Sequence, residues 1–162
     1  MNIFFLHWNT RICAMMYVDK HVIKIIIEIV QMLSCAHHTT SSSYTPPYKL
    51  THKNHPCCIW VRESKSNYKY LVKLGKALCE EYTYRYCKTH KCQAYIKNLG
   101  KNIPPIPDKG FTPPAQAMPD MYKGKDAVEA YRAYYFFDKI RLHAWKKRDV
   151  PDWITETHNM FE

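Results

Sequence analysis

Hydrophobic residues recur at the three- and four-residue steps of a helix between positions 18 and 35, where Val, Ile, Met and Leu predominate. One line of polar residues crosses this segment. Its members are His21, Lys24, Glu28 and Gln31. Steps of three, four and three place all four on one face. The sequence therefore predicts a helix over residues 19–35 with a polar stripe one residue wide.

The same periodicity predicts three further helices. A short one is expected over residues 10–17 and a later one over residues 126–146. The longest is expected over residues 57–90, with a kink between Ser64 and Asn67 because Ser and Asn compete for backbone hydrogen bonds. The chain has only four glycines in 162 residues, which favours helix over sheet. The pattern predicts an all-α fold, a compact helical bundle.

Two segments interrupt the helical pattern. Residues 36–56 are rich in Ser, Thr, Pro and His, and residues 98–122 hold six of the ten prolines. Both are expected to be loops, since proline lacks a backbone donor and cannot continue a helix. Loops this long in a compact domain are often functional, and Phe111 and Met118 make the second a candidate wedge or lid. We expect residues 1–162 to form a single domain.

The chain is strongly basic, with a net charge of +10, and it contains thirteen tyrosines. Cations release counterions from phosphates and aromatic rings stack on bases, so this composition favours a nucleic-acid partner over ordinary solubility charge. Basic and aromatic residues gather at 51–64, 80–91 and 130–148, the first of these at a predicted helix start, which attracts anions. The candidate DNA contacts are Lys53, Asn54, His55, Trp60, Arg62, Arg85, Lys88 and Arg132. Alternatively, Asn54 and His55 only cap a helix and Trp60 lies in the core.

Several other classes of protein are disfavoured. No charged leader with a cleavage site opens the chain, and no apolar run approaches the ~20 residues that a membrane span needs. The seven cysteines are therefore expected to be reduced in an intracellular protein. Cys57 and Cys58 are adjacent, and Cys87, His90 and Cys92 lack the spacing of a zinc site, so we expect neither a metal nor a cofactor. Phosphate-binding loops, nucleophile elbows and dinucleotide fingerprints are missing.

The polar stripe is the strongest candidate for chemistry. A narrow polar line among apolar residues suits the floor of a cleft, although the solvent face of an amphipathic helix is the alternative. Burial in a cleft would shift the pKa of a titratable group towards acid–base use. His21, Lys24 and Glu28 are therefore candidate catalytic residues. We expect the segment 51–56 to close over them, with Arg62 facing the stripe.

Five segments resemble a family of small proteins from phages and large DNA viruses. They are "DKHVIK", "THKNHPCCIWVRESKSNY", "ALCEEYTYRY", "FTPPAQAMPDMYK" and "AVEAYRAYY". The resemblance covers nearly the whole chain. It implies a protein that works in the cytoplasm or nucleus of a host cell.

A second resemblance covers residues 17–90. A helix with the pattern L/V-D-x-x-x-x-K-x-x-x-E, a loop, "N-H-P-x-x-x-W" and a long helix is similar to the pyrimidine dimer DNA glycosylases of the phage endonuclease V type. In that family the N-terminal amine attacks the sugar C1′ with help from a carboxylate on the first long helix, and a Schiff base permits strand cleavage. The resemblance implies duplex DNA as the partner, with a flipped base, and a compact all-α fold.

The match to that family is partial at the catalytic groups. Aligning Asp19 with the start of the family's D-Q-H triplet places its catalytic Glu at Ile25, so Glu28 is the candidate carboxylate. The family's amine is that of a Thr freed by removal of Met, whereas Asn2 is too large for efficient removal. The candidate amines are therefore those of Met1 and Lys24.

The function expected from these observations is DNA repair by an N-glycosylase and abasic-site lyase that acts on damaged or modified bases. Two alternatives stay open. One is a viral enzyme that modifies a base or nucleotide without strand cleavage. The other is a viral nucleic-acid-binding protein without catalysis. A monomer is expected.

Overall fold

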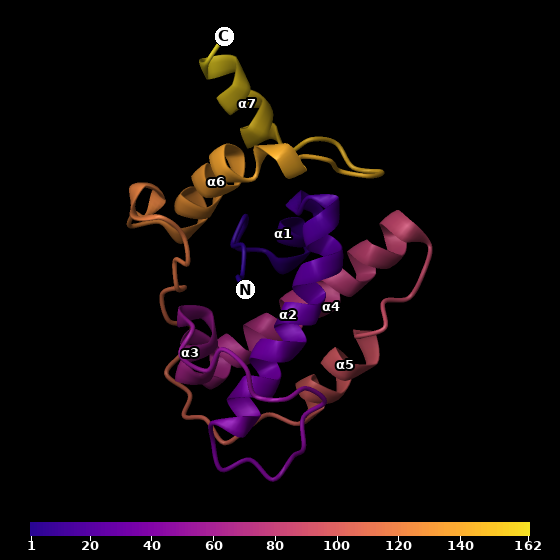
Figure 1. Ribbon diagram of the computed structural model, residues 1–162, viewed down its shortest axis with the longest axis vertical. Coiled ribbons are helices and arrows are strands. Elements are labelled where there is room, and N and C mark those ends of the chain that lie inside the picture. The colour runs from indigo at the N-terminus through magenta and orange to yellow at the C-terminus, as the bar shows by residue number, and fades with distance from the viewer.

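The computed structural model describes residues 1–162 and contains helices but no strand, which confirms the predicted all-α fold (Figure 1). Seven α-helices and two short 3-10 helices follow one another along the chain. Their bounds are α1 Thr10–Met16, α2 Asp19–His38, α3 Pro56–Glu63, α4 Lys65–Tyr86, α5 Gln93–Lys101, η1 Asp120–Tyr122, α6 Ala127–Asp138, η2 Ile140–Leu142 and α7 Asp152–Met160.

The two longest helices, α2 and α4, pack against each other at the centre of the molecule, and α5 packs on both. Gly75 of α4 allows this close approach. A Cβ atom there would lie 3.0 Å from Ile96 Cδ1 of α5 and 3.2 Å from Ile29 Cγ2 of α2. Leu71 and Leu78, on the same side of α4, are fully buried. The apolar periodicity of α2 and α4 therefore becomes the main core of the protein.

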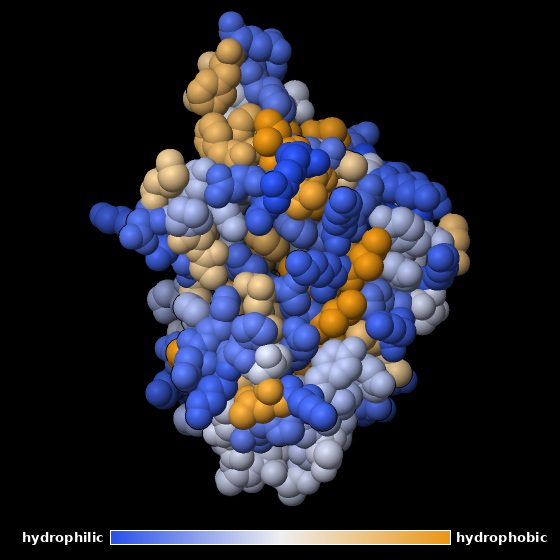
Figure 2. Space-filling model, in the orientation of Figure 1, coloured by the Kyte–Doolittle hydropathy of each residue, from blue (hydrophilic) through white to orange (hydrophobic).

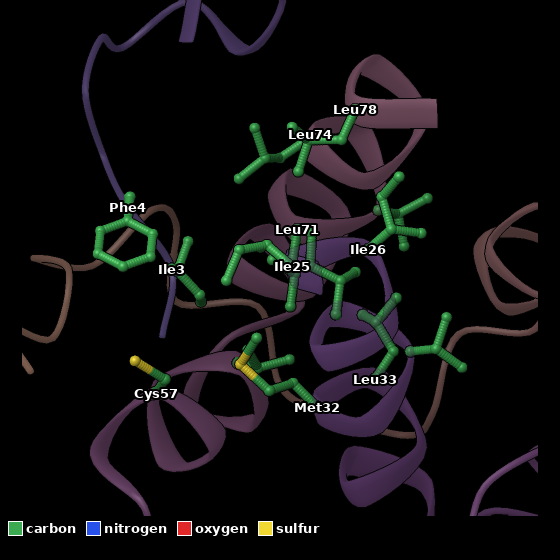
Figure 3. Packing of buried hydrophobic residues seen from close by; sticks show 14 of the residues in the cluster. Ile3, Phe4, Ile25, Ile26, Met32, Leu33, Cys57, Leu71, Leu74 and Leu78 are labelled. Carbon is green, nitrogen blue, oxygen red and sulfur yellow. The ribbon is translucent and has the colours of Figure 1, made fainter. Parts of the chain in front are cut away.

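The N-terminal segment runs through the core rather than over the surface. Ile3, Phe4, Phe5 and Leu6 are all at most 3% exposed. Figure 3 shows Ile3 reaching towards side chains of α2 and α4, with Cys57 of α3 beneath them. Burial of four apolar side chains fixes this segment, and it brings the first two residues against α2.

The helix predicted over residues 57–90 is two helices. Ser64 lies between α3 and α4 in an extended conformation, with φ −150° and ψ 142°. Its hydroxyl donates to the Gly110 carbonyl at 2.7 Å and accepts from the Lys109 N–H at 2.9 Å. The kink expected between Ser64 and Asn67 is therefore a complete break at Ser64. α4 ends at Tyr86, and Cys87 caps it in the left-handed conformation, with φ 56°. Residues 87–90, which were predicted to be helical, lie between α4 and α5.

The C-terminal third also differs from the prediction. The helix expected over residues 126–146 ends at Asp138, and the loop expected over residues 98–122 begins inside α5. Two helices, α5 and α7, were not predicted. α5 buries Ile96 and Leu99, and α7 buries Ile154. Each helix has only 9 residues, fewer than the ~11–18 over which a helical period is recognised.

Hydrophilic residues cover most of the face in Figure 2, with hydrophobic ones in separate patches. No helix combines the length and the apolar character needed to span a membrane. All seven cysteines are free thiols, and six of them are buried.

Candidate active site

Glu28 meets the N-terminus of the chain. Its Oε1 atom lies 3.3 Å from the α-amino nitrogen of Met1 and accepts the Asn2 backbone N–H at 2.9 Å. The side chains of Met1 and Glu28 are only 3% and 10% exposed. An ion pair so removed from water is stronger than a surface pair, since solvent screens it less. The carboxylate of the polar stripe is thus in direct contact with the terminal amine.

His21, one of the four stripe residues, lies beside this pair. Its ring stacks on Phe4, with centroids 4.5 Å apart and planes 12° from parallel. The Tyr135 hydroxyl lies 2.8 Å from His21 Nδ1 and accepts the Val18 N–H at 2.9 Å. Burial, together with the positive charges of Lys139 and Lys24, lowers the pKa of His21 to about 4. The imidazole is therefore neutral at pH 7, and Tyr135 fixes its orientation.

Asn2 connects the N-terminus to a segment far along the chain. Its Nδ2 atom donates to the Ala117 carbonyl at 2.8 Å, and its Oδ1 atom accepts from the Tyr131 hydroxyl at 2.9 Å. Oδ1 also accepts the Ile3 N–H at 2.9 Å. Asn2 is 8% exposed and Tyr131 is fully buried. These hydrogen bonds hold the first residues of the chain against α6 and the segment before it.

A cavity of about 120 Å³ opens beside Met1, Glu28 and His21. Two lysines on its rim, Lys24 of α2 and Lys139 at the end of α6, make it electropositive. The Lys139 Nζ atom lies 5.0 Å from the centre of the Tyr134 ring. The full lining is Met1, Asn2, Phe4, His21, Lys24, Ile25, Glu28, Tyr134 and Lys139. A buried carboxylate, an amine and a neutral imidazole thus surround one small cavity with a cationic rim.

The polar stripe is a cleft floor along part of its length. His21, Lys24 and Glu28 line the cavity, whereas Gln31, one turn further along α2, does not. Lys24 is exposed, so it lacks the desolvation expected of an amine nucleophile. The roof was predicted wrongly. It is formed by the N-terminal segment and α6 instead of residues 51–56.

One residue of the segment 51–56 does lie near the site. His55 caps α3 by accepting the Cys57 N–H, and its pKa is lowered by burial and by the positive charge of the Met1 amine, with an opposing effect of Glu28. Arg62 points elsewhere, because it donates to the Lys53 carbonyl at 2.6 Å. His55 is thus the residue of the predicted roof that lies near the Met1 amine and Glu28.

Two of the predicted DNA contacts have buried side chains. Arg85 is 0% exposed and donates to Glu81 at 2.7 Å and to Asp19 at 2.9 Å, so it joins α4 to the start of α2. Trp60 is 2% exposed and donates to the Thr112 carbonyl at 3.1 Å. Both side chains are held inside the protein by these contacts.

The other candidate DNA contacts differ in accessibility. Lys53, Asn54 and Lys88 are exposed. Arg132 is half-buried, and its Nε atom donates to the Leu6 carbonyl at 2.8 Å while its guanidinium lies over Trp153. The exposed residues stay candidates for DNA contact, whereas Arg132 is held within the protein by hydrogen bonding and stacking.

Four residues around the cavity were not predicted from the sequence. Asn2, Tyr134 and Lys139 line it, and Tyr131 of α6 contacts Asn2 from behind. The tyrosines of α6 recur at helical spacing. This spacing indicates which face of the helix is buried, but not which residues that face packs against. No three His, Cys, Asp or Glu side chains converge in a way that would hold a metal ion.

The family match agrees with the geometry at the N-terminus. A model of the pyrimidine dimer DNA glycosylase family matches residues 1–94, which is more than half of the chain. The chain belongs to this family. No curated protein and no solved structure matches it. Membership in the pyrimidine dimer DNA glycosylase family points to DNA repair of the glycosylase type and to DNA as the substrate. The resemblance to small viral proteins stays a prediction.

The matched residues include Met1, His21 and Glu28 but stop before α6, which forms the other part of the roof. Ala117, Tyr131 and Lys139 lie beyond residue 94, although they contact or line the same site. In this member of the pyrimidine dimer DNA glycosylase family, a segment outside the matched region completes the site.

Proposed function

We propose that this protein is a DNA N-glycosylase with abasic-site lyase activity, and that the α-amino group of Met1 is its nucleophile. The observation that carries the proposal is the 3.3 Å separation of the Met1 amine from Glu28 in a cavity rimmed by Lys24 and Lys139. A nucleophile next to a base is the arrangement that covalent catalysis needs. Cationic rim residues suit the phosphates on either side of the target nucleotide.

The chemistry follows from these groups. Glu28 accepts a proton from the Met1 ammonium, and the neutral amine attacks C1′ of the target nucleotide. The bond between C1′ and the base breaks, and the base leaves with the electron pair and takes up a proton. Opening of the sugar ring then gives an imine between Met1 and C1′. Loss of a C2′ proton breaks the bond between C3′ and its phosphate, and water finally releases the amine. Once Glu28 has passed its proton to the leaving base, it is again a carboxylate and stabilises the positive charge of the protonated imine.

His21 and the cationic rim have separate roles in this proposal. A neutral imidazole, held by Tyr135, can donate one hydrogen bond without adding a charge that would repel the developing oxocarbenium ion. Lys24 and Lys139 then bind the flanking phosphates. The cavity of about 120 Å³ is smaller than the ~300–1,000 Å³ pockets that enclose whole ligands, so it suits the sugar carbon rather than an entire flipped nucleotide.

The proposal is tested by trapping the imine with borohydride on three labelled duplexes: one abasic, one with a pyrimidine dimer and one undamaged. We expect a covalent adduct with the first two and none with the third. Peptide mapping of the adduct should place the added mass on the peptide that contains Met1. Mass on the peptide that contains Lys24 would contradict the choice of nucleophile. No adduct on any duplex would contradict the lyase activity.

The same assay distinguishes the alternative functions. A base-modifying enzyme without strand cleavage would form no adduct, yet it would be stabilised thermally by a nucleotide. A non-catalytic binding protein would retain its DNA affinity when Lys24 and Glu28 are both replaced. We favour the glycosylase and lyase over both alternatives because the Met1 amine contacts the Glu28 carboxylate and both residues lie within the region that the family model matches.

A further inference from the structure

Asn2 is the most heavily hydrogen-bonded side chain near the candidate nucleophile. Its two polar atoms bond to the Ala117 carbonyl, the Tyr131 hydroxyl and the Ile3 N–H, at 2.8 to 2.9 Å. The Cys57 thiol lies 3.8 Å from the same Oδ1 atom. A buried side chain with every polar group satisfied has one orientation, because any rotation would leave donors or acceptors unpaired. Asn2 is therefore fixed from three sides.

Tyr131 is fixed in the same way. Its hydroxyl lies 2.8 Å from the Ala115 carbonyl and accepts the Ala117 N–H at 3.1 Å, besides its contact with Asn2. The ring packs edge-on against Phe4, with centroids 6.0 Å apart. Burial of the phenol raises its pKa far above the usual range, so the hydroxyl stays protonated at all pH values at which the protein works. It is a permanent partner for the Asn2 side chain.

These contacts bear directly on the nucleophile. The Asn2 backbone N–H that bonds to Glu28 and the Met1 amine beside it belong to adjoining residues. Fixing the Asn2 side chain therefore fixes where the amine points. Misplacing a reacting group by about 1 Å can slow a reaction by about two orders of magnitude. Contacts that hold Asn2 are thus contacts that hold the amine at Glu28.

We propose that Tyr131 and Asn2 are positioning residues: the Tyr131 hydroxyl and the Ala117 carbonyl clamp the Asn2 side chain and so hold the Met1 amine in its reactive position against Glu28. This inference rests on the proposed function. It assigns a role in that reaction to the segment 115–131, which lies beyond the matched residues 1–94. The side chains of Tyr131 and Asn2 form no hydrogen bond with the Met1 amine or with Glu28.

The test compares Tyr131→Phe with Tyr68→Phe. Both changes remove one buried hydroxyl, but that of Tyr68 bonds to His37 and the Leu99 carbonyl, away from the cavity. For Tyr131→Phe, we expect the maximal rate of imine trapping on abasic DNA to fall by about tenfold or more. The DNA concentration that gives half the maximal rate should change by less than about twofold, since the rim lysines are untouched. Tyr68→Phe should leave both quantities at their wild-type values.

A second measurement separates positioning from loss of structure and does not depend on DNA. The Met1 amine is allowed to react with a small aldehyde and borohydride, and the modified N-terminal peptide is followed by mass spectrometry. An amine released from Glu28 is more accessible, so Tyr131→Phe should raise this rate while trapping on DNA falls. Asn2→Leu, in which the large side chain should retain Met1, should behave in the same way; an intact mass confirms the retention.

The outcomes distinguish the two proposals. If the wild type forms no adduct with abasic DNA, the proposed function fails, yet a faster aldehyde reaction in Tyr131→Phe still supports the clamp. If the wild type is trapped and Tyr131→Phe is trapped at the same maximal rate, the clamp is overturned. An aldehyde reaction of Met1 that is unchanged in both variants overturns it as well.

Discussion

The imidazole of His21 lies flat against the ring of Phe4, with their centroids 4.5 Å apart. This contact joins the stripe on α2 to the N-terminal segment, and it also removes His21 from water. Burial and the positive charges of Lys139 and Lys24 both disfavour the protonated form of this ring. The stability of the site is therefore linked to the protonation of one residue.

Acid should destabilise the protein through His21. The pKa of His21 is about 4 in the folded protein, against 6.5 for an ordinary histidine. Between these values the unfolded chain binds the proton more readily, so the stabilising contribution is complete above pH 6.5 and is lost as the pH falls towards 4. The loss is of the order of 3 kcal/mol by the free energy of one pKa unit. Urea unfolding of the wild type and of His21→Gln at pH 7, 6 and 5 measures it. Parallel slopes in the two proteins would contradict the assignment.

Glu28→Gln should separate binding from chemistry. The amide keeps an oxygen for the Asn2 N–H but cannot take a proton from the Met1 amine. We expect the rate of imine formation to fall by about 10²–10⁴-fold, as for other lost acid–base groups, with DNA affinity nearly unchanged. Circular dichroism of the variant shows whether the helices are retained. Full activity in a folded variant would mean that Glu28 has no part in catalysis.

Arg85 should matter for stability rather than for DNA binding. It is fully buried between Glu81 and Asp19, and it also donates to the carbonyls of Tyr17 and Met15. Breaking such a buried pair typically costs about 3–5 kcal/mol. Arg85→Met should show this loss in urea unfolding.

Lys88 provides the matched control for Arg85, since it is an exposed cation just beyond the end of α4. Lys88→Met should change the free energy of unfolding by less than about 0.5 kcal/mol. DNA affinity, measured with the folded fraction of each variant, should be unaffected by Arg85→Met. A selective loss of affinity in Arg85→Met at full stability would restore Arg85 as a DNA contact.

The rim lysines should govern the salt dependence of DNA binding. If Lys24 and Lys139 each neutralise one phosphate, replacing both by Ala lowers the slope of log K against log salt by about 1.8, from ~0.9 per contact. Lys101→Ala, at the end of α5, removes a charge from an element that does not line the cavity. The variants are compared by fluorescence anisotropy on a labelled duplex, over salt concentrations of roughly 50 to 200 mM. Equal slopes would show that the rim does not bind phosphate.

The fold and half of the site could be predicted from the sequence because their signals are local. The stripe on α2 follows from helical spacing within eleven residues, and it led to His21 and Glu28. The break at Ser64 was only partly foreseen, since it depends on hydrogen bonds to residues 109 and 110. α5 and α7 were missed because each is too short for a helical period to stand out from the sequence around it.

The roof of the cavity could not have been predicted from spacing. Asn2 bonds to Ala117 and Tyr131, which are 115 and 129 positions away. Such contacts arise from the packing of α6 on the N-terminal segment, and nothing in the neighbouring sequence of either partner reports them. Arg85 was predicted to contact DNA but is buried in an ion-pair network. The sequence does not distinguish these cases, because a basic residue among tyrosines occurs in both settings.

The distance along the chain between the two ends of the clamp also governs when the site can form. A ribosome releases Met1 and Asn2 first and Tyr131 more than a hundred residues later. Until Tyr131 emerges, the N-terminal segment lacks the partners that hold Asn2, although α2 and Glu28 are already made. Contacts of such long range form late in folding, because closing the chain over them costs the most entropy. The nascent protein therefore completes the site around the Met1 amine only after Tyr131 has been synthesised.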